Sequence, residues 1–385
     1  MDKQLNTIVK VIVGAGVITF LGFLPWIFIS NRGDSVNKLT DKITSSNESV
    51  VNLKEAMYYE SLENGYVQCN LCPNKCLLAE GQRGTCKVRE NRGGKLYSLV
   101  YGKPATVHVD PIEKKPLFHF LPGANAYSLA TAGCNLSCQH CQNWDISQVF
   151  PEDISSYDKP PEQVVAEAMQ AGAEVIAFTY SEPVVFYEYM LDIAKVAQSR
   201  GVKTVMISGG YINEEPLREL LPYLDGVKID LKAYSDEFYE KITNGQLQPI
   251  LDTIKTIANK GTHLEIVYLI IPGENDSEKE IREMSQWLYA LMGERAIIHF
   301  SRFHPDYKML NKPPTPIATM KRAHEIALEE GIKYVYTGNM EYPEAEATYC
   351  DDGSIGIQRQ GYFILKNVLT RGKCADGTKI PGVWN

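Results

Sequence analysis

The feature that most constrains the fold is a regular alternation of apolar and helical segments between residues 123 and 340. Each apolar run is followed by a segment with helical spacing. The segment Glu162–Gln170 is closed by Gly172, and Ser277 with Glu280 forms a capping box that opens another helix. Near-continuous apolar strands separated by helices predict a parallel sheet covered by helices. The strands are expected at Ala126–Ala132, Val175–Tyr180, Lys203–Ser208, Val227–Leu231, Leu264–Ile271, Ala296–Phe300 and Lys333–Tyr336.

The number of these units predicts the fold class. Roughly six or seven strand–helix units indicate an α/β protein with a full or partial (β/α) TIM-like barrel. In such barrels the chemistry lies in the loops that follow the C-terminal ends of the strands. Polar residues at or just beyond predicted strand ends are therefore the candidate functional residues: Cys134, Glu182, Ser208, Asp230 and His304.

Five segments are expected along the chain. Residues 1–30 form an N-terminal anchor, and 31–57 form a polar tether rich in Ser, Asn, Asp and Lys. Residues 58–122 form a small cysteine-rich module, 123–340 the barrel, and 341–385 a C-terminal tail.

The predicted anchor rests on Val11–Ile29, a run of 19 residues without a charge. At about 1.5 Å per residue this run would span roughly 28 Å, close to the hydrocarbon thickness of a bilayer. A cleaved signal peptide is the alternative, with Lys3 and Lys10 as its basic region. The run is long for that role, and no small-x-small cleavage site follows it. Basic residues are nearly balanced on the two sides, so charge does not fix the orientation.

Composition excludes several classes of protein. Hydrophobic residues make up 44% and charged residues 22% of the chain, which is ordinary for a globular protein. The 39 Lys and Arg against 47 Asp and Glu give a net charge of -8. Phosphate binding needs a basic surface, so we expect no nucleic-acid partner.

The nine cysteines are too few for a disulfide scaffold in a chain of 385 residues. Seven of them fall between Cys69 and Cys141, in two tight groups. Tight groups indicate metal sites.

The second cysteine group consists of Cys134, Cys138 and Cys141, with the spacing C-x3-C-x2-C after the first predicted strand. Three thiolates on one short loop can hold three irons of a 4Fe-4S cluster. The loop has no fourth cysteine, so one iron would stay open to another molecule, as a catalytic zinc keeps an open position. A zinc site that includes His140, or a ferredoxin cluster closed by a distant cysteine, is the alternative.

The first group consists of Cys69, Cys72, Cys76 and Cys86, with the spacing C-x2-C-x3-C-x9-C. Four thiolates suffice to close a metal site. Structural zinc and a second 4Fe-4S cluster that passes electrons to the first both fit the spacing. Small four-cysteine modules are usually structural, which favours zinc slightly.

The cysteine loop resembles the signature of the radical SAM superfamily. The chain from about Tyr58 onward is similar to the radical SAM component of the AmmeMemoRadiSam system, whose core resembles pyruvate formate-lyase activating enzymes. An N-terminal membrane segment is not part of the usual pattern. The motifs that carry the resemblance are Cys69-Asn-Leu-Cys72-Pro-Asn-Lys-Cys76, Gly84-Thr-Cys86-Lys-Val-Arg89, Asp110-Pro-Ile-Glu-Lys-Lys-Pro116, Leu121-Pro-Gly123, Gly133-Cys134-Asn135, Cys141-Gln-Asn-Trp144 and Thr179-Tyr-Ser-Glu-Pro183.

The resemblance implies a chemistry. In such enzymes the open iron is chelated by the amino and carboxylate groups of S-adenosylmethionine (SAM). An electron from the reduced cluster splits the S–C5′ bond, and the 5′-deoxyadenosyl radical removes a hydrogen atom from the substrate. The cluster ligands implied here are Cys134, Cys138 and Cys141.

The resemblance also implies contacts to SAM. Glu182 would hold the SAM amine, or else only cap a helix before Pro183. Asp230 and Lys232 would lie near the SAM ribose and carboxylate, or else form an ordinary strand-end ion pair. His304 would contact the SAM carboxylate, or else be a loop histidine. The relatives carry Asp-Thr-Asn-Gly where this chain has Ile207-Ser-Gly-Gly210, so the Asp of that motif is absent here.

The C-terminal tail departs from the family. Relatives often carry two CxxC pairs before a terminal Ile-Pro-Gly-Val-Trp, which this chain keeps at residues 380–384. Only Cys350 and Cys374 remain of the four cysteines. We expect a degenerate zinc-ribbon-like tail that folds without metal. A two-cysteine site completed by His or Asp is the alternative.

The sequence thus predicts a membrane-anchored radical SAM enzyme whose catalytic domain faces the cytoplasm, where SAM and reductant are available. Its expected partners are an electron donor such as flavodoxin or ferredoxin and a protein or small-molecule substrate. Memo-like and AMMECR-type proteins, the family's genomic companions, are further candidates. Two other classes of function compete: a membrane-tethered iron–sulfur electron carrier, and a zinc-scaffold interaction protein.

Overall fold

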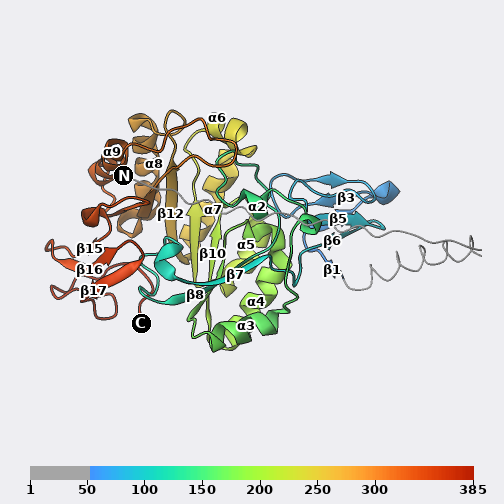
Figure 1. Ribbon diagram of the computed structural model, residues 1–385, viewed down its shortest axis with the longest axis horizontal. Coiled ribbons are helices and arrows are strands. Elements are labelled where there is room, and N and C mark those ends of the chain that lie inside the picture. The colour runs from blue at the N-terminus through green and yellow to red at the C-terminus, as the bar shows by residue number, and fades with distance from the viewer. Residues whose placement is uncertain (1–52) are drawn as a thin grey trace, which may run out of the picture. The chain divides into compact units, whose positions relative to one another are not determined.

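An eight-stranded sheet forms the centre of the computed structural model, which describes residues 53–385. Its strand order is β14-β13-β12-β11-β10-β9-β8-β7 (Figure 1). The seven strands from β8 to β14 are parallel and lie in the order of the sequence, which confirms the predicted parallel sheet. Their bounds are β8 Asn125–Ala130, β9 Val175–Phe178, β10 Lys203–Ser208, β11 Gly226–Asp230, β12 His263–Ile270, β13 Ile297–Arg302 and β14 Tyr334–Gly338.

The remaining strand, β7 (Thr106–Pro111), pairs antiparallel with β8. It was not expected, because residues 58–122 were assigned to the cysteine-rich module. β7 is an edge strand, so one long side has no neighbour and residues such as His108 and Val109 are exposed. Such a strand lacks the apolar run that identifies the buried ones. Among the described residues β14 and β7 are the two open edges, so the sheet is a partial barrel.

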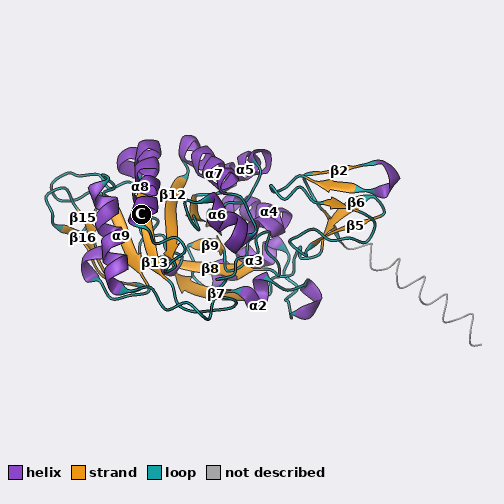
Figure 2. Ribbon diagram, turned by 90° about the horizontal axis from the view of Figure 1, so that it is seen from above, coloured by secondary structure: helices purple, strands orange, loops and turns teal. Residues whose placement is uncertain are grey.

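Helices cover the parallel strands, and Figure 2 shows α4, α5, α7 and α8 together on one side of them. The Ser277 hydroxyl accepts a hydrogen bond from the Glu280 backbone N–H at 3.2 Å, as half of a capping box requires. The Glu280 carboxylate, however, accepts from the Tyr234 backbone and the Tyr268 hydroxyl. The longer helices are α3 Pro161–Gln170, α4 Tyr187–Ser199, α5 Glu214–Leu220, α7 Leu247–Lys260, α8 Glu278–Met292 and α9 Ile317–Glu329.

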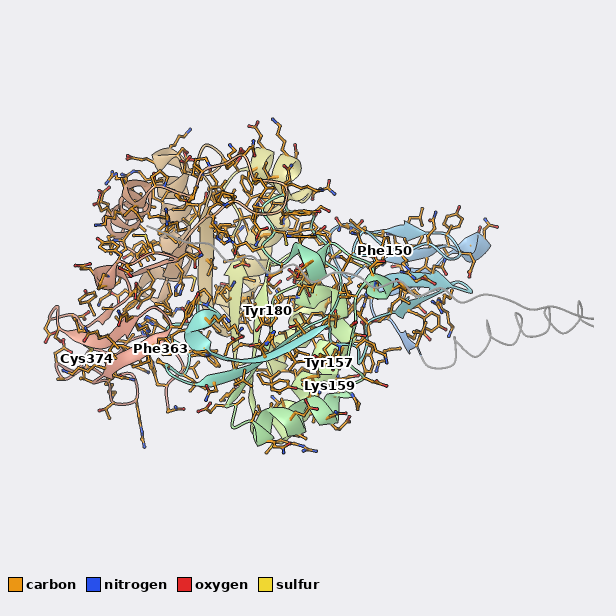
Figure 3. The ribbon with its side chains drawn as sticks, viewed as in Figure 1. Phe150, Tyr157, Lys159, Tyr180, Phe363 and Cys374 are labelled. Carbon is orange, nitrogen blue, oxygen red and sulfur yellow. A yellow bond between two sulfur atoms is a disulfide. The ribbon has the colours of Figure 1, made fainter. Side chains whose placement is uncertain are left out.

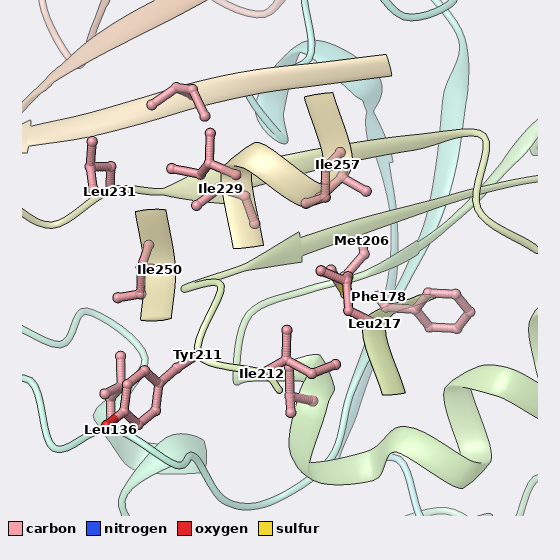
Figure 4. Packing of buried hydrophobic residues seen from close by; sticks show 14 of the residues in the cluster. Leu136, Phe178, Met206, Tyr211, Ile212, Leu217, Ile229, Leu231, Ile250 and Ile257 are labelled. Atoms are coloured by element: carbon pink, nitrogen blue, oxygen red, sulfur yellow. The ribbon is translucent and has the colours of Figure 1, made fainter. Parts of the chain in front are cut away.

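The core lies between the helices and the sheet. Figure 4 shows Met206, Ile229, Leu217 and Ile257 within it, and all four side chains are buried. Leu136 from the loop after β8 is buried in the same cluster. The apolar core thereby extends to the loop that carries the second cysteine group.

The N-terminal module consists of two three-stranded sheets with the orders β1-β6-β5 and β2-β3-β4. A buried ion pair between Arg89 and Glu188 of α4 joins the module to the barrel. The Asn213 backbone N–H, just before α5, donates to the Leu71 carbonyl at 3.0 Å. The strands are β1 Lys54–Glu55, β2 Tyr59–Ser61, β3 Val67–Cys69, β4 Leu77–Leu78, β5 Arg89–Arg92 and β6 Lys95–Ser98.

The C-terminal tail forms a further sheet of β15 (Thr348–Tyr349), β16 (Ile355–Gln360) and β17 (Phe363–Asn367). Cys350 and Cys374 are joined by a disulfide bond, with a Cα–Cα distance of 6.1 Å. The pair lies against Phe118 and Tyr336 in a small apolar cluster. The two sulfurs are bonded to each other, so the alternative of a two-cysteine metal site is not formed here.

The predicted anchor (1–30) and the tether up to residue 52 lie outside the described residues. Among the helices of residues 53–385, none has both the length and the apolar character needed to cross a membrane.

Candidate functional site

A cavity of about 640 Å³ opens at the C-terminal ends of the parallel strands. This is the place where parallel α/β folds carry their ligands. Of the predicted site residues, it is lined by Cys134, Cys138, Cys141, Glu182, Asp230 and Lys232. His304 is exposed and is not among the lining residues of the described chain. Its Nδ1 lies 3.3 Å from the Gln142 side-chain nitrogen, and Gln142 lines the cavity, so His304 lies outside the cavity wall.

The cysteine loop follows β8 and is held from two sides. Gly133 has φ +95°, and a Cβ there would lie 2.6 Å from the Cys86 carbonyl oxygen and 2.6 Å from Val88 Cγ1. On the other side, the Ser137 and Gln139 backbone N–H groups donate to carbonyls of residues 243 and 242 at 2.8 and 2.9 Å. The backbone of the loop is therefore fixed by its neighbours.

Burial governs the protonation of the three thiols of this loop. Burial raises the pKa of all three thiols, that of Cys138 to about 12, so a metal must supply the charge that makes them thiolates. Among residues 53–385, no three His, Cys, Asp or Glu side chains converge closely enough to hold one metal ion. A 4Fe-4S cluster places each thiolate on a different iron, farther apart than around one zinc. Within the described chain no other cysteine lines the cavity, so a 4Fe-4S cluster held by this loop would keep one iron without a protein thiolate.

His140 is buried in this loop, and burial lowers its pKa to about 3, which keeps the imidazole neutral. Its Nδ1 has no hydrogen-bond partner among the described residues. His140, which the zinc alternative from the sequence includes, lines the same cavity as the three cysteines.

Glu182 lies after β9 and is 4% exposed. Its Oε1 accepts from the Val184 backbone N–H at 3.1 Å and from the Ser208 hydroxyl at 2.6 Å, and its Oε2 accepts from the Gly209 N–H at 2.8 Å. Glu182 therefore caps the short helix that begins at Pro183 and also lines the cavity. Burial raises the pKa of Glu182, although the three donors oppose that shift. Both roles considered from the sequence are compatible with this position.

Asp230 lies at the end of β11 between two lysines. It forms ion pairs with Lys228 and with Lys232, the latter at 3.2 Å. Burial alone would raise the pKa of Asp230, but the two lysine charges outweigh it and lower the pKa to about 2. Lys228 and Asp230 share a face because strand side chains alternate, and both line the cavity. The strand-end ion pair considered from the sequence is therefore formed, and it lies on the cavity wall.

The cavity wall also carries Lys115 and Tyr180, which the sequence analysis did not identify as site residues. Lys115, 3% exposed, donates from Nζ to the Asp110 carboxylate at 2.6 Å and to the Tyr180 hydroxyl at 3.2 Å. The Tyr180 hydroxyl also donates to Asp110. Figure 3 labels Tyr180, which has the unusual φ of +64°. Burial lowers the pKa of Lys115 to about 8.

Besides His140 Nδ1, two further buried polar atoms of the cavity lining lack partners among the described residues. One is Oε2 of Glu113, whose other oxygen accepts from the Gly123 N–H at 2.9 Å. The other is the hydroxyl of Thr337 at the end of β14. Both residues line the cavity, as do Glu346 and Tyr362 of the tail. The only sequence signal for Lys115 and Glu113 was the motif Asp110–Pro116, which carried the resemblance without indicating a role.

The chain matches a family model and several known proteins. The family model of the Radical SAM superfamily matches residues 128–285. The chain is 44% identical over 308 residues to Uncharacterized protein MJ0808 of Methanocaldococcus jannaschii, covering 80% of this chain and 92% of that protein. It is 24% identical over 225 residues to Pyruvate formate-lyase 1-activating enzyme of Escherichia coli K12, covering 53% of this chain and 89% of that enzyme. A solved domain of pyruvate-formate lyase-activating enzyme from Bacteroides vulgatus aligns at 20% identity with a TM-score of 0.39, covering 42% of this chain and 98% of that one.

Proposed function

The chain belongs to the radical SAM superfamily, and on that premise we propose that it removes a hydrogen atom from a substrate by reductive cleavage of SAM. The cluster held by Cys134, Cys138 and Cys141 would supply the electron, and SAM bound at its open iron would supply the 5′-deoxyadenosyl radical. The observation that carries the proposal is that the three thiols line one cavity with buried charged groups from the neighbouring strand ends.

The residues of the cavity wall support distinct roles in binding. The Glu182 carboxylate, a buried anion fixed by three donors, suits the protonated amine of SAM. Lys228 and Lys232 on either side of Asp230 suit the SAM carboxylate and ribose hydroxyls. His304, outside the cavity wall, has weaker support as a contact to the SAM carboxylate.

The remaining wall suits the substrate. Glu113 offers a buried carboxylate oxygen without a partner, and Lys115 and Tyr180 offer donors beside it in the motif that follows β7. We propose that these groups orient the substrate and keep water out.

A protein substrate is our preferred candidate, because the relatives include enzymes named for the activation of pyruvate formate-lyase. Tyr362, which lines the cavity, and Phe363 beside it are exposed at 45% and 70%, so an apolar surface adjoins the cavity. To test this, the native cells are grown in heavy water, and their extract is separated into a high-mass and a low-mass fraction. Each fraction is then incubated with the reconstituted enzyme, SAM and reductant. Deuterium should enter 5′-deoxyadenosine from the high-mass fraction, whereas transfer from the low-mass fraction would identify a small molecule.

The test of the function itself is the anaerobic incubation of reconstituted full-length protein with SAM and dithionite. We expect 5′-deoxyadenosine and methionine in equal amounts, and neither without reductant. A protein with its cluster loaded that forms neither would contradict the proposal. The alternative is an iron–sulfur electron carrier without catalysis. Such a carrier would not need a cavity of this size beside the cluster loop. The physiological electron donor we propose is of the flavodoxin or ferredoxin class.

A further inference from the structure

A second, smaller cavity lies in the N-terminal module, and all four of the module's cysteines line it. Cys69 ends β3, Cys72 and Cys76 lie between β3 and β4, and Cys86 precedes β5. The Cys69 backbone N–H donates to the Cys76 carbonyl at 2.9 Å, which closes the first turn around the cavity. The fold therefore gathers four thiols that are up to 17 residues apart in sequence.

The size of this cavity distinguishes between the two metal sites that the sequence allowed. Tetrahedral zinc holds its four sulfurs about 2.3 Å from the ion, which leaves no room for a water-sized sphere among them. The cavity here has about 20 Å³, more than the ~10–15 Å³ that one water molecule needs. No three of the described ligand-type side chains converge on a single ion, and the same is true of the loop at Cys134. The cavity therefore has more free space than the centre of a tetrahedral zinc site leaves.

The groups around the cavity suit an anionic occupant. Arg89 is 2% exposed and lines the cavity, and its Nη2 forms the buried ion pair with Glu188. Its Nη1 lies 3.8 Å from Cys69 Sγ, and its buried Nε has no hydrogen-bond partner among the described residues. The Thr85 backbone N–H points to Cys76 Sγ at 3.5 Å. Donors aimed at sulfur suit a metal centre of four thiolates, which carries net negative charge with a 4Fe-4S cluster as with zinc.

We propose that Cys69, Cys72, Cys76 and Cys86 hold a second 4Fe-4S cluster, closed by four thiolates and therefore without an iron open to SAM. This replaces the slight preference for zinc that the sequence alone supported. The inference stands on the module and does not require the proposed function.

The position of this cluster suggests what it does. Gly133 packs against the Cys86 carbonyl, the next residue is the cluster ligand Cys134, and Asn135 lines the second cavity. The Asn74 side chain donates to the Asn135 carbonyl at 2.8 Å. The two clusters thus flank one short stretch of backbone. The second cluster would take one electron from the flavodoxin- or ferredoxin-type donor, which is oxidised, and pass that electron to the first without transfer of atoms.

Metal analysis of full-length protein tests the site. After anaerobic reconstitution we expect about eight irons per chain in the wild type and about four in Cys134→Ala/Cys138→Ala/Cys141→Ala. Cys350→Ala/Cys374→Ala is the matched control and should keep about eight. One zinc and no iron in the triple variant would overturn the proposal, as would a triple variant that folds by circular dichroism but holds neither metal.

Two spectroscopic and chemical measurements separate this proposal from the proposed function. The EPR signal of the reduced triple variant should be unchanged by SAM, and a change would show an open iron in the N-terminal module. Fully reduced wild type, freed of excess dithionite, should cleave about two SAM per chain if each cluster stores one electron that reaches SAM. A yield of about one would overturn the relay role. If the wild type cleaves no SAM while the triple variant keeps its iron, the proposed function fails and the second cluster stands.

Discussion

At the scale of single residues, Glu182 is the most important of the proposed contacts to SAM. Glu182→Gln keeps the shape but removes the charge. A hydrogen bond to a charged group contributes about 1.5–3 kcal/mol, so SAM affinity should fall by roughly 10- to 100-fold. The amide would also face the Gly209 N–H donor, so thermal stability should fall as well. Titration with SAM, followed by EPR, measures the affinity.

Ser208→Ala is the matched control for this prediction. It removes one donor to Glu182 and leaves the carboxylate in place. Stability should fall while SAM affinity changes little. Equal losses of SAM affinity in both variants would show that the hydrogen-bond network, and not the charge of Glu182, matters for binding.

Gly133 is a second decisive residue, because it combines φ +95° with contact to the Cys86 carbonyl. Gly133→Ala adds about 1–2 kcal/mol of backbone strain and a steric clash. We expect a lower melting temperature and poor loading of the cluster at Cys134, as measured by iron content. Gly172→Ala offers a control with a similar φ of +67° and open space around the added carbon. If both variants load the cluster alike, packing against the N-terminal module is not required.

At the scale of elements, the tail is held to the barrel by a neutral histidine. His119 Nδ1 lies 2.7 Å from the Pro381 carbonyl and must donate to it, so Nε2 accepts from the Tyr336 hydroxyl at 2.6 Å. Burial lowers the pKa of His119 to about 3, despite the nearby charge of Glu265. In the unfolded chain His119 takes up a proton near pH 6.5. In the folded chain it stays neutral until the pH falls to about 3. This contribution to stability is complete above pH 6.5 and is lost as the pH falls toward 3.

The measurement is chemical denaturation between pH 7.5 and 4.5. His119→Gln should be less stable than wild type at pH 7.5, and its free energy of unfolding should fall less steeply with acid, by up to about 1.4 kcal/mol per pH unit. His108→Gln, at an exposed position of β7, should keep the wild-type slope. An unchanged slope in His119→Gln would refute the assignment.

Elements also show how far the sequence predicts this structure. The strands β8 to β14 were predictable because buried parallel strands are continuous apolar runs. β7 was not, because an edge strand with exposed His108 and Val109 lacks that pattern. Whether the sheet closes depends on the pairing of its edges, which no local pattern encodes. The cysteine spacing predicted the cluster loop, whereas Lys115 reaches the cavity only through contacts with Asp110 and Tyr180.

At the scale of the whole molecule, the charge-free run Val11–Ile29 predicts that the enzyme is attached to a membrane. Full-length protein should stay with membranes through alkaline and high-salt washing, because a spanning helix resists what removes surface-bound proteins. Deletion of residues 1–40 should release a soluble protein with unchanged SAM cleavage. Full-length protein in the soluble fraction would contradict the anchor, and a mature N-terminus near Ser30 would favour a signal peptide.

The most direct test of the central claim is whether SAM binds to an iron on the loop of Cys134, Cys138 and Cys141. Reduced full-length protein is mixed with SAM labelled with nitrogen-15 in its amino group, and electron–nuclear double resonance is recorded. The account predicts hyperfine coupling between the label and the cluster in the wild type, and none in Cys134→Ala/Cys138→Ala/Cys141→Ala. A wild-type protein with its cluster loaded and SAM bound, but without that coupling, would contradict it.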